Sequence, residues 1–269
     1  MKKYVFGALL SAWNNRDLIK VLAKREVESR YRGALMGNVW VFINPLIMLA
    51  INTMVFQFIF KAKWPNAPES DFAFSPLMFV GMIVHSFASE VLSRSSALIL
   101  RNTNYVKKVT FPLDILPWIT LESALAHALI SFGILCLFLI VTSLSVAWTW
   151  LLLPFILLPF CLFLLGLSWV LAALGVYFRD LDQMMGLLLT ALLFLSPVFY
   201  SLESSPEQLR PFLEMNPLTL IIEQSRLVLI HHQLPDLQAL ALYYVFAFSV
   251  FVLGFLVFNK LKRGFADVL

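Results

Sequence analysis

The sequence predicts an all-α polytopic membrane protein, and its composition and hydropathy pattern are the two observations that indicate this fold class. Of its 269 residues, 60% are hydrophobic and only 13% are charged, whereas a soluble domain has about 25% charged residues. Apolar stretches of about 18 residues or more recur along the chain, and such a stretch crosses a bilayer core of about 30 Å as a helix. Six transmembrane helices are therefore expected, at residues 36–60, 76–93, 113–143, 150–177, 184–200 and 239–258.

The segment before the first span predicts a helix that lies in the membrane surface. Residues 14–33 are too charged and too short to span, which is typical of an amphipathic interface helix. Gly33 and Gly37 then allow the chain to turn into the first span. The first 35 residues lack the apolar core of a signal peptide, so we expect no cleavable signal.

The connections around the next spans are rich in proline or very short. The second span follows the sequence KAKWPNAPESDFAFSP, in which Pro65, Pro68 and Pro76 stop helix propagation. Only the uncharged sequence SLSVAWTW separates the third span from the fourth, and its two tryptophans suit a membrane interface. The third and fourth spans are therefore expected to form a tight hairpin.

Residues 201–238 predict a helix, a break and a second helix. Ser205 is a suitable N-cap with Pro206 at the first helical position, Asn216-Pro217 ends that helix, and a second apolar helix runs from about 218 to 230. Neither helix is long enough to span, so we expect a re-entrant hairpin, which is tolerated only beside protein or a water-filled cavity. Such a hairpin can gate a pathway, and a loop on the surface is the alternative. The gate candidates are Pro206, Phe212, Asn216 and Pro217.

The distribution of basic residues predicts the orientation. Six spans put both termini on one side, which carries 16 Lys and Arg residues: eight in the N-terminal segment, four in residues 94–112, one in residues 178–183 and three in the C-terminal tail. The other side carries four. The positive-inside rule places the richer side in the cytoplasm. The net charge of +4 therefore indicates topology rather than binding to nucleic acid.

Several other function classes lack their sequence patterns here. No G-x-x-x-x-G-K-[ST] phosphate loop occurs, so we expect no ATP site in this chain. His231 and His232 diverge by about 100° on a helix, and Cys136 and Cys161 lie in apolar runs, so no metal site is expected. Neither internal repeats nor mid-membrane charges indicate an ion-coupled carrier. We expect no catalytic residue and no cofactor.

Two short loops are the most informative polar segments. The turn at residues 178–183 contains the D-x-D pattern of Asp180 and Asp182, which many metal-dependent glycosyltransferases use, so a membrane-embedded glycosyl or acyl transferase is one alternative. A turn of about six residues does not supply the rest of an active site. A mechanical role is therefore favoured, in which this turn and residues 94–112 form a docking face that transmits a partner's motion.

Aromatic residues are abundant, with 25 Phe, seven Trp and seven Tyr. Most of them are expected to face lipid or to pack between helices, but an aromatic ring also stacks on a sugar ring without any charge. The candidates for such a channel lining lie near the outer ends of the first and fifth spans: Phe56, Phe60, Phe194, Phe199 and Tyr200.

Several motifs resemble permease subunits of ABC-2 type exporters for polysaccharides. They are REVESRYRGALMGNVWVFINPL, NYVKKVTFPLDILP, YFRDLDQ, and SPVFY with a later MNPL, and they run in the family's order from about residue 16 to 226. The family includes exporters of lipid-linked O-antigen, capsular polysaccharide and teichoic acid. The RYRG sequence looks most like the O-antigen and teichoic-acid branch, with Met36-Gly37 in place of the usual Leu-Gly. Export of O-antigen is the first expectation.

The resemblance implies a single ABC-2 transmembrane domain over residues 1–269, in the bacterial cytoplasmic (inner) membrane. It implies a homodimer with two separate ATPase subunits, which would bind ATP and Mg, and a lipid-linked polysaccharide as substrate. The first and fifth spans would line the channel, and the outer hairpin would be its gate. The ATPase-coupling residues would be Asn104, Lys107, Lys108, Tyr177, Arg179, Asp180 and Asp182.

The basic interface helix would receive the lipid end of that substrate. Arg25, Arg30 and Arg32 are placed to attract its pyrophosphate. Headgroups of anionic membrane lipids are the alternative ligand for these arginines.

Overall fold

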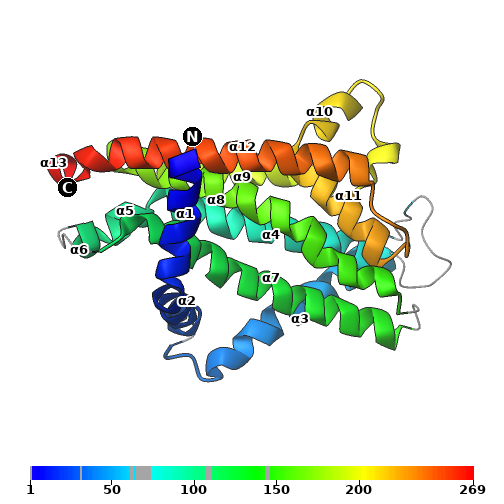
Figure 1. Cartoon of the computed structure of the whole chain (residues 1–269). Helices are drawn as coiled ribbons and strands as arrows, with labels where there is room; N and C mark the ends of the chain where they lie inside the picture. Colours follow the sequence, from blue (N-terminus) through cyan, green and yellow to red (C-terminus); the bar gives the residue numbers. More distant parts are fainter. Residues whose placement is uncertain (1, 31, 61–63, 65–73, 107–110, 143–145) are drawn as a thin grey trace.

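A bundle of long helices, crossed near one end by two shorter helices, makes up the computed structural model (Figure 1). The structure describes residues 2–30, 32–60, 64, 74–106, 111–142 and 146–269, and these residues contain helices and no strand. α5 (Leu98–Arg101) and α6 (Thr103–Val106) lie at one end of the bundle, and α10 (Arg210–Glu214) and α11 (Pro217–Leu229) lie at the other. We refer to these as the α5–α6 end and the α10–α11 end.

Five helices are long and apolar enough to cross a membrane, and they fall where five of the expected spans lie. The first, α3, continues at its end into a π-helix over Thr53–Ile59. The bounds of the five are α3 (Trp40–Asn52), α4 (Phe74–Ser96), α7 (Leu116–Val141), α8 (Leu153–Tyr177) and α12 (Leu237–Leu261). A multi-pass membrane protein is the fold class that the described residues support.

The expected fifth span at 184–200 is wrong in its length. The apolar helix there, α9, covers Leu181–Phe194, which is 14 residues, or about 21 Å at 1.5 Å per residue. The chain then turns, because Pro197 has no amide to donate and its ring would clash with the preceding helical turn. The hydroxyl of Ser196 donates to the Leu192 carbonyl at 2.6 Å beside this end. The count of six full-length spans is therefore not confirmed.

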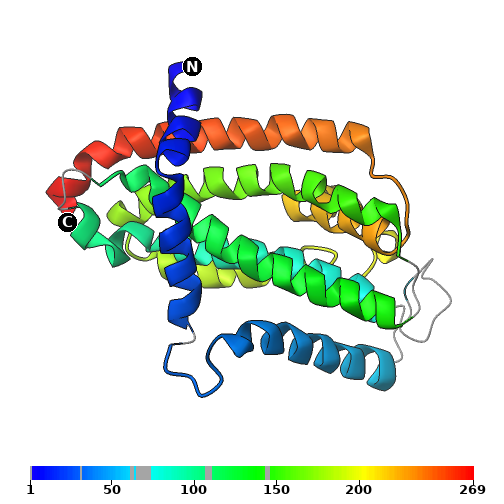
Figure 2. The same ribbon diagram turned by 60° about the horizontal axis from the view of Figure 1, so that its bottom comes forward.

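The N-terminal segment forms two helices rather than the single helix expected at 14–33. α1 covers Lys2–Asn14 and α2 covers Arg16–Arg30, and the side-chain amide of Asn15 between them donates to the Ser11 carbonyl at 2.8 Å. Both helices run across the bundle, as Figure 2 shows. α2 packs on α7 and buries Ile19 and Ala23. This crossing orientation agrees with a helix in the membrane surface.

The helix expected to start at Pro206 starts later. The amides of Leu209 and Arg210 both donate to the Pro206 carbonyl in a turn, and α10 begins at Arg210. The Ser205 hydroxyl donates to the Ser201 carbonyl instead of capping a helix. The break at Asn216-Pro217 is confirmed, because Asn216 caps α11 with its side chain and Pro217 begins that helix. A second helix near 218–230 is also confirmed.

The centre of the bundle is α4, which packs on α7, α8, α9 and α11. In the most apolar stretch of α4, 78% of the residues are buried. In the corresponding stretch of the span that contains α3, only 11% are buried. The most extensive contact between two helices is that of α8 with α12, where the backbones meet at two glycines. A Cβ atom on Gly254 would lie 2.1 Å from the carbonyl oxygen of Gly166. Only a residue without a side chain allows this approach.

Gly254→Ala should therefore destabilise the fold, because the added methyl group forces α8 and α12 apart. We expect a loss of about 1–3 kcal/mol, as for other overpacked cores, measured as a lower midpoint of thermal unfolding in detergent. Gly133→Ala in α7 is the matched control, since no neighbouring atom lies within 4 Å of its added Cβ. Equal midpoints for the two variants would contradict the close contact.

Candidate functional site

The turn between α8 and α9 projects from the α5–α6 end. Tyr177, Arg179 and Asp180 are exposed there, and the Tyr177 hydroxyl donates to the Leu261 carbonyl of α12 at 2.9 Å. This bond fixes the end of α8 to the end of α12. The two charged side chains that follow remain accessible to a partner.

Asp182 connects this turn to the second predicted docking loop. One carboxylate oxygen accepts a hydrogen bond from the Ser96 hydroxyl at 2.6 Å, and the other lies 3.6 Å from the Arg101 guanidinium. Ser96 ends α4 and Arg101 ends α5. Asn104 is exposed on α6, whereas Lys107 and Lys108 lie outside the described residues. The structure thus brings the two docking loops together as one surface.

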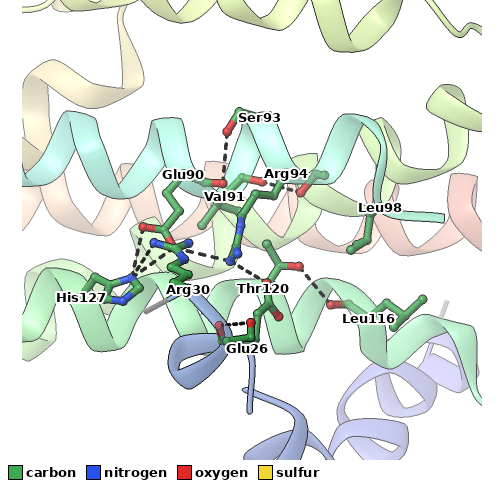
Figure 3. Close-up of polar contacts among 12 residues, drawn as sticks. Glu26, Arg30, Glu90, Val91, Ser93, Arg94, Leu98, Leu116, Thr120 and His127 are labelled. Atoms are coloured by element: carbon green, nitrogen blue, oxygen red, sulfur yellow. Dashed lines mark hydrogen bonds and ion pairs between the residues drawn. The ribbon is translucent and has the colours of Figure 1, made fainter. Parts of the chain in front are cut away.

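A network of charged side chains joins α2 to α4 and α7 (Figure 3). Glu26 and Arg30 of α2 face Arg94 and Glu90 of α4. Arg94 Nη1 lies 2.5 Å from Glu26 Oε1, and Arg30 forms an ion pair with Glu90. His127 Nδ1 of α7 lies 3.1 Å from Arg30 Nη1 and 3.2 Å from Glu90 Oε1. The two ion pairs run in opposite directions, so they fix the register of α2 on α4.

The three arginines predicted to receive a pyrophosphate therefore differ in their surroundings. Arg25 and Arg32 are exposed, whereas the Arg30 guanidinium is engaged with Glu90 and lies beside His127. Burial raises the pKa of the Glu26 carboxyl, although the Arg94 and Arg30 guanidiniums lower it. Glu26 thus takes up a proton at a higher pH than an exposed glutamate does, and its ion pair with Arg94 weakens as the pH falls.

The predicted channel aromatics gather near the α10–α11 end. Phe56 stacks on Phe199 with 5.8 Å between ring centroids and contacts Phe60 at 5.7 Å. Phe194 lies 6.2 Å from Phe199, and the Tyr200 hydroxyl donates to the Phe194 carbonyl at 3.1 Å. Segments from α3 and α9 thus meet through their aromatic side chains. Whether these rings face a channel or lipid stays a prediction.

Of the gate candidates, Asn216 makes the most contacts. Its side-chain amide donates to the Leu195 carbonyl at 3.0 Å and to the Ser196 hydroxyl at 2.9 Å, and its oxygen accepts from the Leu218 amide at 2.9 Å. Asn216 therefore ties the start of α11 to the end of α9. Pro206 and Phe212 are exposed on the same segment, and Pro217 lies at the start of α11.

Comparison with known proteins decides the family. The sequence model of the ABC-2 type transporter family matches residues 17–230, which include α2 from its second residue and both docking loops. The chain belongs to the ABC-2 type transporter family. The described helices, without a strand and with five of spanning length, agree with a membrane-embedded member of it.

The relatives that this chain resembles are named for O-antigen export and polysialic acid transport. The chain is 24% identical over 269 residues to an O-antigen export system permease protein RfbA of Klebsiella pneumoniae, covering 99% of this chain and 98% of the relative. A protein of the same name from Myxococcus xanthus is 29% identical over 84% of this chain and 85% of its own. The polysialic acid transport protein KpsM of Escherichia coli is 24% identical over 77% of this chain and 79% of the relative.

Arg226 of α11 is a buried residue of this ABC-2 protein. From the sequence it was only one of the four basic residues assigned to the outer side of the membrane. Its side chain is buried, and its Nε donates to the Leu77 carbonyl at 2.8 Å. Its two terminal nitrogens donate to Glu223 at 2.8 Å and to the Val198 carbonyl at 3.2 Å, and the guanidinium lies 4.4 Å from the Trp64 ring centroid. One side chain thus joins α11, α4 and the turn after α9. Two opposite charges three residues apart, Glu223 and Arg226, in an otherwise largely apolar helix were the only signal of it.

Replacing Arg226 by Met should destabilise the protein strongly. The change leaves the Leu77 and Val198 carbonyls and the Glu223 carboxylate without their donor, and each buried polar group left without a partner costs about 1–3 kcal/mol. The expected observation is a large fall in the thermal midpoint in detergent. Arg263→Met, at an exposed position near the C-terminus, should change the midpoint little, within about 0.5 kcal/mol. Similar midpoints for both variants would show that the buried contacts are unimportant.

Proposed function

We propose that this chain is the permease subunit of an ATP-driven exporter that moves a lipid-linked polysaccharide across the cytoplasmic membrane. O-antigen is the first candidate for this substrate. The observation that carries the proposal is the joined docking surface at the α5–α6 end, in a member of the ABC-2 family. The RfbA relatives, which match 84–99% of this chain, are named for O-antigen export. The KpsM relatives make export of a capsular polysaccharide the second candidate.

The energy is proposed to come from separate subunits. Two ATPase subunits would bind ATP and Mg and would seat the exposed turn at Tyr177, Arg179 and Asp180. Movement of this turn passes into α9 directly, because α9 begins at the next residue, Leu181. The far end of α9 carries Phe194 and leads to Phe199, so the same movement shifts the aromatic contact with Phe56.

A homodimer is proposed because α3 and α9 are poorly covered within one chain. Large apolar side chains on both helices are exposed, and helices of a bundle interior would bury them. Pairing two copies through these helices would form a path between the protomers, with Phe56, Phe60, Phe194, Phe199 and Tyr200 near its outer part. These aromatic rings would stack on the sugar units without any charge, so a polymer could pass along them.

The topology that goes with this proposal has both termini in the cytoplasm. The α5–α6 end faces the ATPases, and α9 with the turn after it serves as a shortened fifth span. α10 and α11 then re-enter the outer leaflet, where α11 packs on α4 and α8. The packing supports this for α11, which lies against protein as a short helix within a membrane must, whereas large apolar side chains near and in α10 are exposed.

Copurification from native membranes tests whether the chain binds an ATPase subunit. The wild-type chain should bring down an ATPase subunit, and Arg179→Ala with Asp180→Ala should deplete it, because both exposed charges of the turn are lost. Asp182 is left unchanged, since its bonds to Ser96 and Arg101 are internal. Glu203→Ala with Glu207→Ala, two exposed residues near the opposite end, is the control. An absent ATPase in the wild-type sample would refute the proposal.

A further inference from the structure

A cavity of about 430 Å³ opens between α2, the end of α4, α5 and the start of α7. Three arginines from three helices line it: Arg25 of α2, Arg94 of α4 and Arg101 of α5. Glu26 is the one carboxylate among its described lining residues. The cavity therefore has an excess of positive charge, and it adjoins the ion pairs shown in Figure 3.

Part of the lining of the same cavity is apolar, and we call it the apolar wall. Leu22, Leu98, Leu116 and Ile119 form it. Arginine binds phosphate oxygens with paired hydrogen bonds, and an aliphatic wall favours a hydrocarbon chain. A purely polar anion would leave that wall uncovered. The two kinds of lining together fit a molecule that carries phosphate next to a hydrocarbon chain.

We propose that this cavity binds the phosphate groups of a phosphorylated amphiphile, and that the ligand competes with Asp182 for Arg101. The assignment to the lipid pyrophosphate of the exported substrate rests on the proposed function. An anionic phospholipid headgroup offers the same chemistry, and the experiment below separates the two sources.

The competition follows from how loosely Arg101 is held. Its guanidinium lies 3.6 Å from Asp182, and the two side chains are 60% and 46% exposed, so solvent screens their attraction. A pyrophosphate carries more than one negative charge and attracts Arg101 more strongly than a single carboxylate does. Arg94, in contrast, lies between Glu26 and Glu90 and is fixed in place.

The exchange has a consequence for the docking turn. Once Arg101 turns to the phosphate, Asp182 keeps only its hydrogen bond from Ser96. The α8–α9 turn, where Arg179 and Asp180 are exposed, then loses its ion pair with α5. A ligand in the cavity is thereby sensed at the surface that faces the ATPase.

Binding of farnesyl diphosphate to the purified full-length chain in detergent, measured by titration calorimetry, tests the proposal. Arg25→Gln and Arg101→Gln should each weaken binding about tenfold, as expected for the loss of a charged hydrogen bond. Asp182→Asn should tighten binding several-fold, because the competitor for Arg101 is gone. Arg263→Gln, exposed and outside the cavity, should bind as the wild type does.

The opposite signs make the outcome decisive, because a misfolded variant cannot bind the probe more tightly. Unchanged affinity in both arginine variants overturns the site, and unchanged affinity in Asp182→Asn overturns the competition. Inorganic pyrophosphate that binds as tightly as farnesyl diphosphate removes the role of the apolar wall. Tighter binding of short-chain phosphatidylglycerol than of farnesyl diphosphate excludes the substrate as occupant. None of these measurements needs the ATPase, so failure of the proposed function is seen separately, in the copurification.

Discussion

The whole arrangement depends on one constraint: inside a bilayer, backbone polar groups must bond within the chain, and a charge without a partner is costly. The long helices satisfy their own backbones, and the ion pairs among the described residues lie toward the ends of the bundle. The pairs of Arg30 with Glu90 and Arg101 with Asp182 lie at the α5–α6 end, and Arg226 with Glu223 lies at the other. The protein therefore has two polar ends that a long apolar bundle connects.

The charged side chains at these two ends differ in how exposed they are and in what they connect. At the α5–α6 end the pairs are partly exposed and link elements that a partner can reach, such as α5 and the turn after α8. At the α10–α11 end Arg226 is 1% exposed and holds three segments together through two carbonyl oxygens and a carboxylate. Loosely held charges suit a surface that must move. The buried arginine instead sets the position from which the outer helices work.

Much of the fold could be predicted because the spans are long and apolar, and because Asn216-Pro217 is a strong local break. The end of α9 was missed although Pro197 marks it, since the apolar run continues past the proline to Tyr200. The docking loops could be named from local sequence, but their connection through Asp182 could not. Nor could the partners of Arg30, because Glu90 and His127 belong to other helices and periodicity does not show how helices face each other.

The π-helix at Thr53–Ile59 gives α3 a freedom in length that the other spans lack. Each of its hydrogen-bonded turns holds one residue more than an α-helical turn, as in the bond from the Phe60 amide to the Val55 carbonyl at 2.9 Å. Loss of one residue here restores an ordinary α-helix without a break in the span. Because the wide turn takes up the extra residue locally, the remainder of the helix keeps its orientation. The span can therefore lose one residue at this point while it stays continuous and presents the same face to its neighbours.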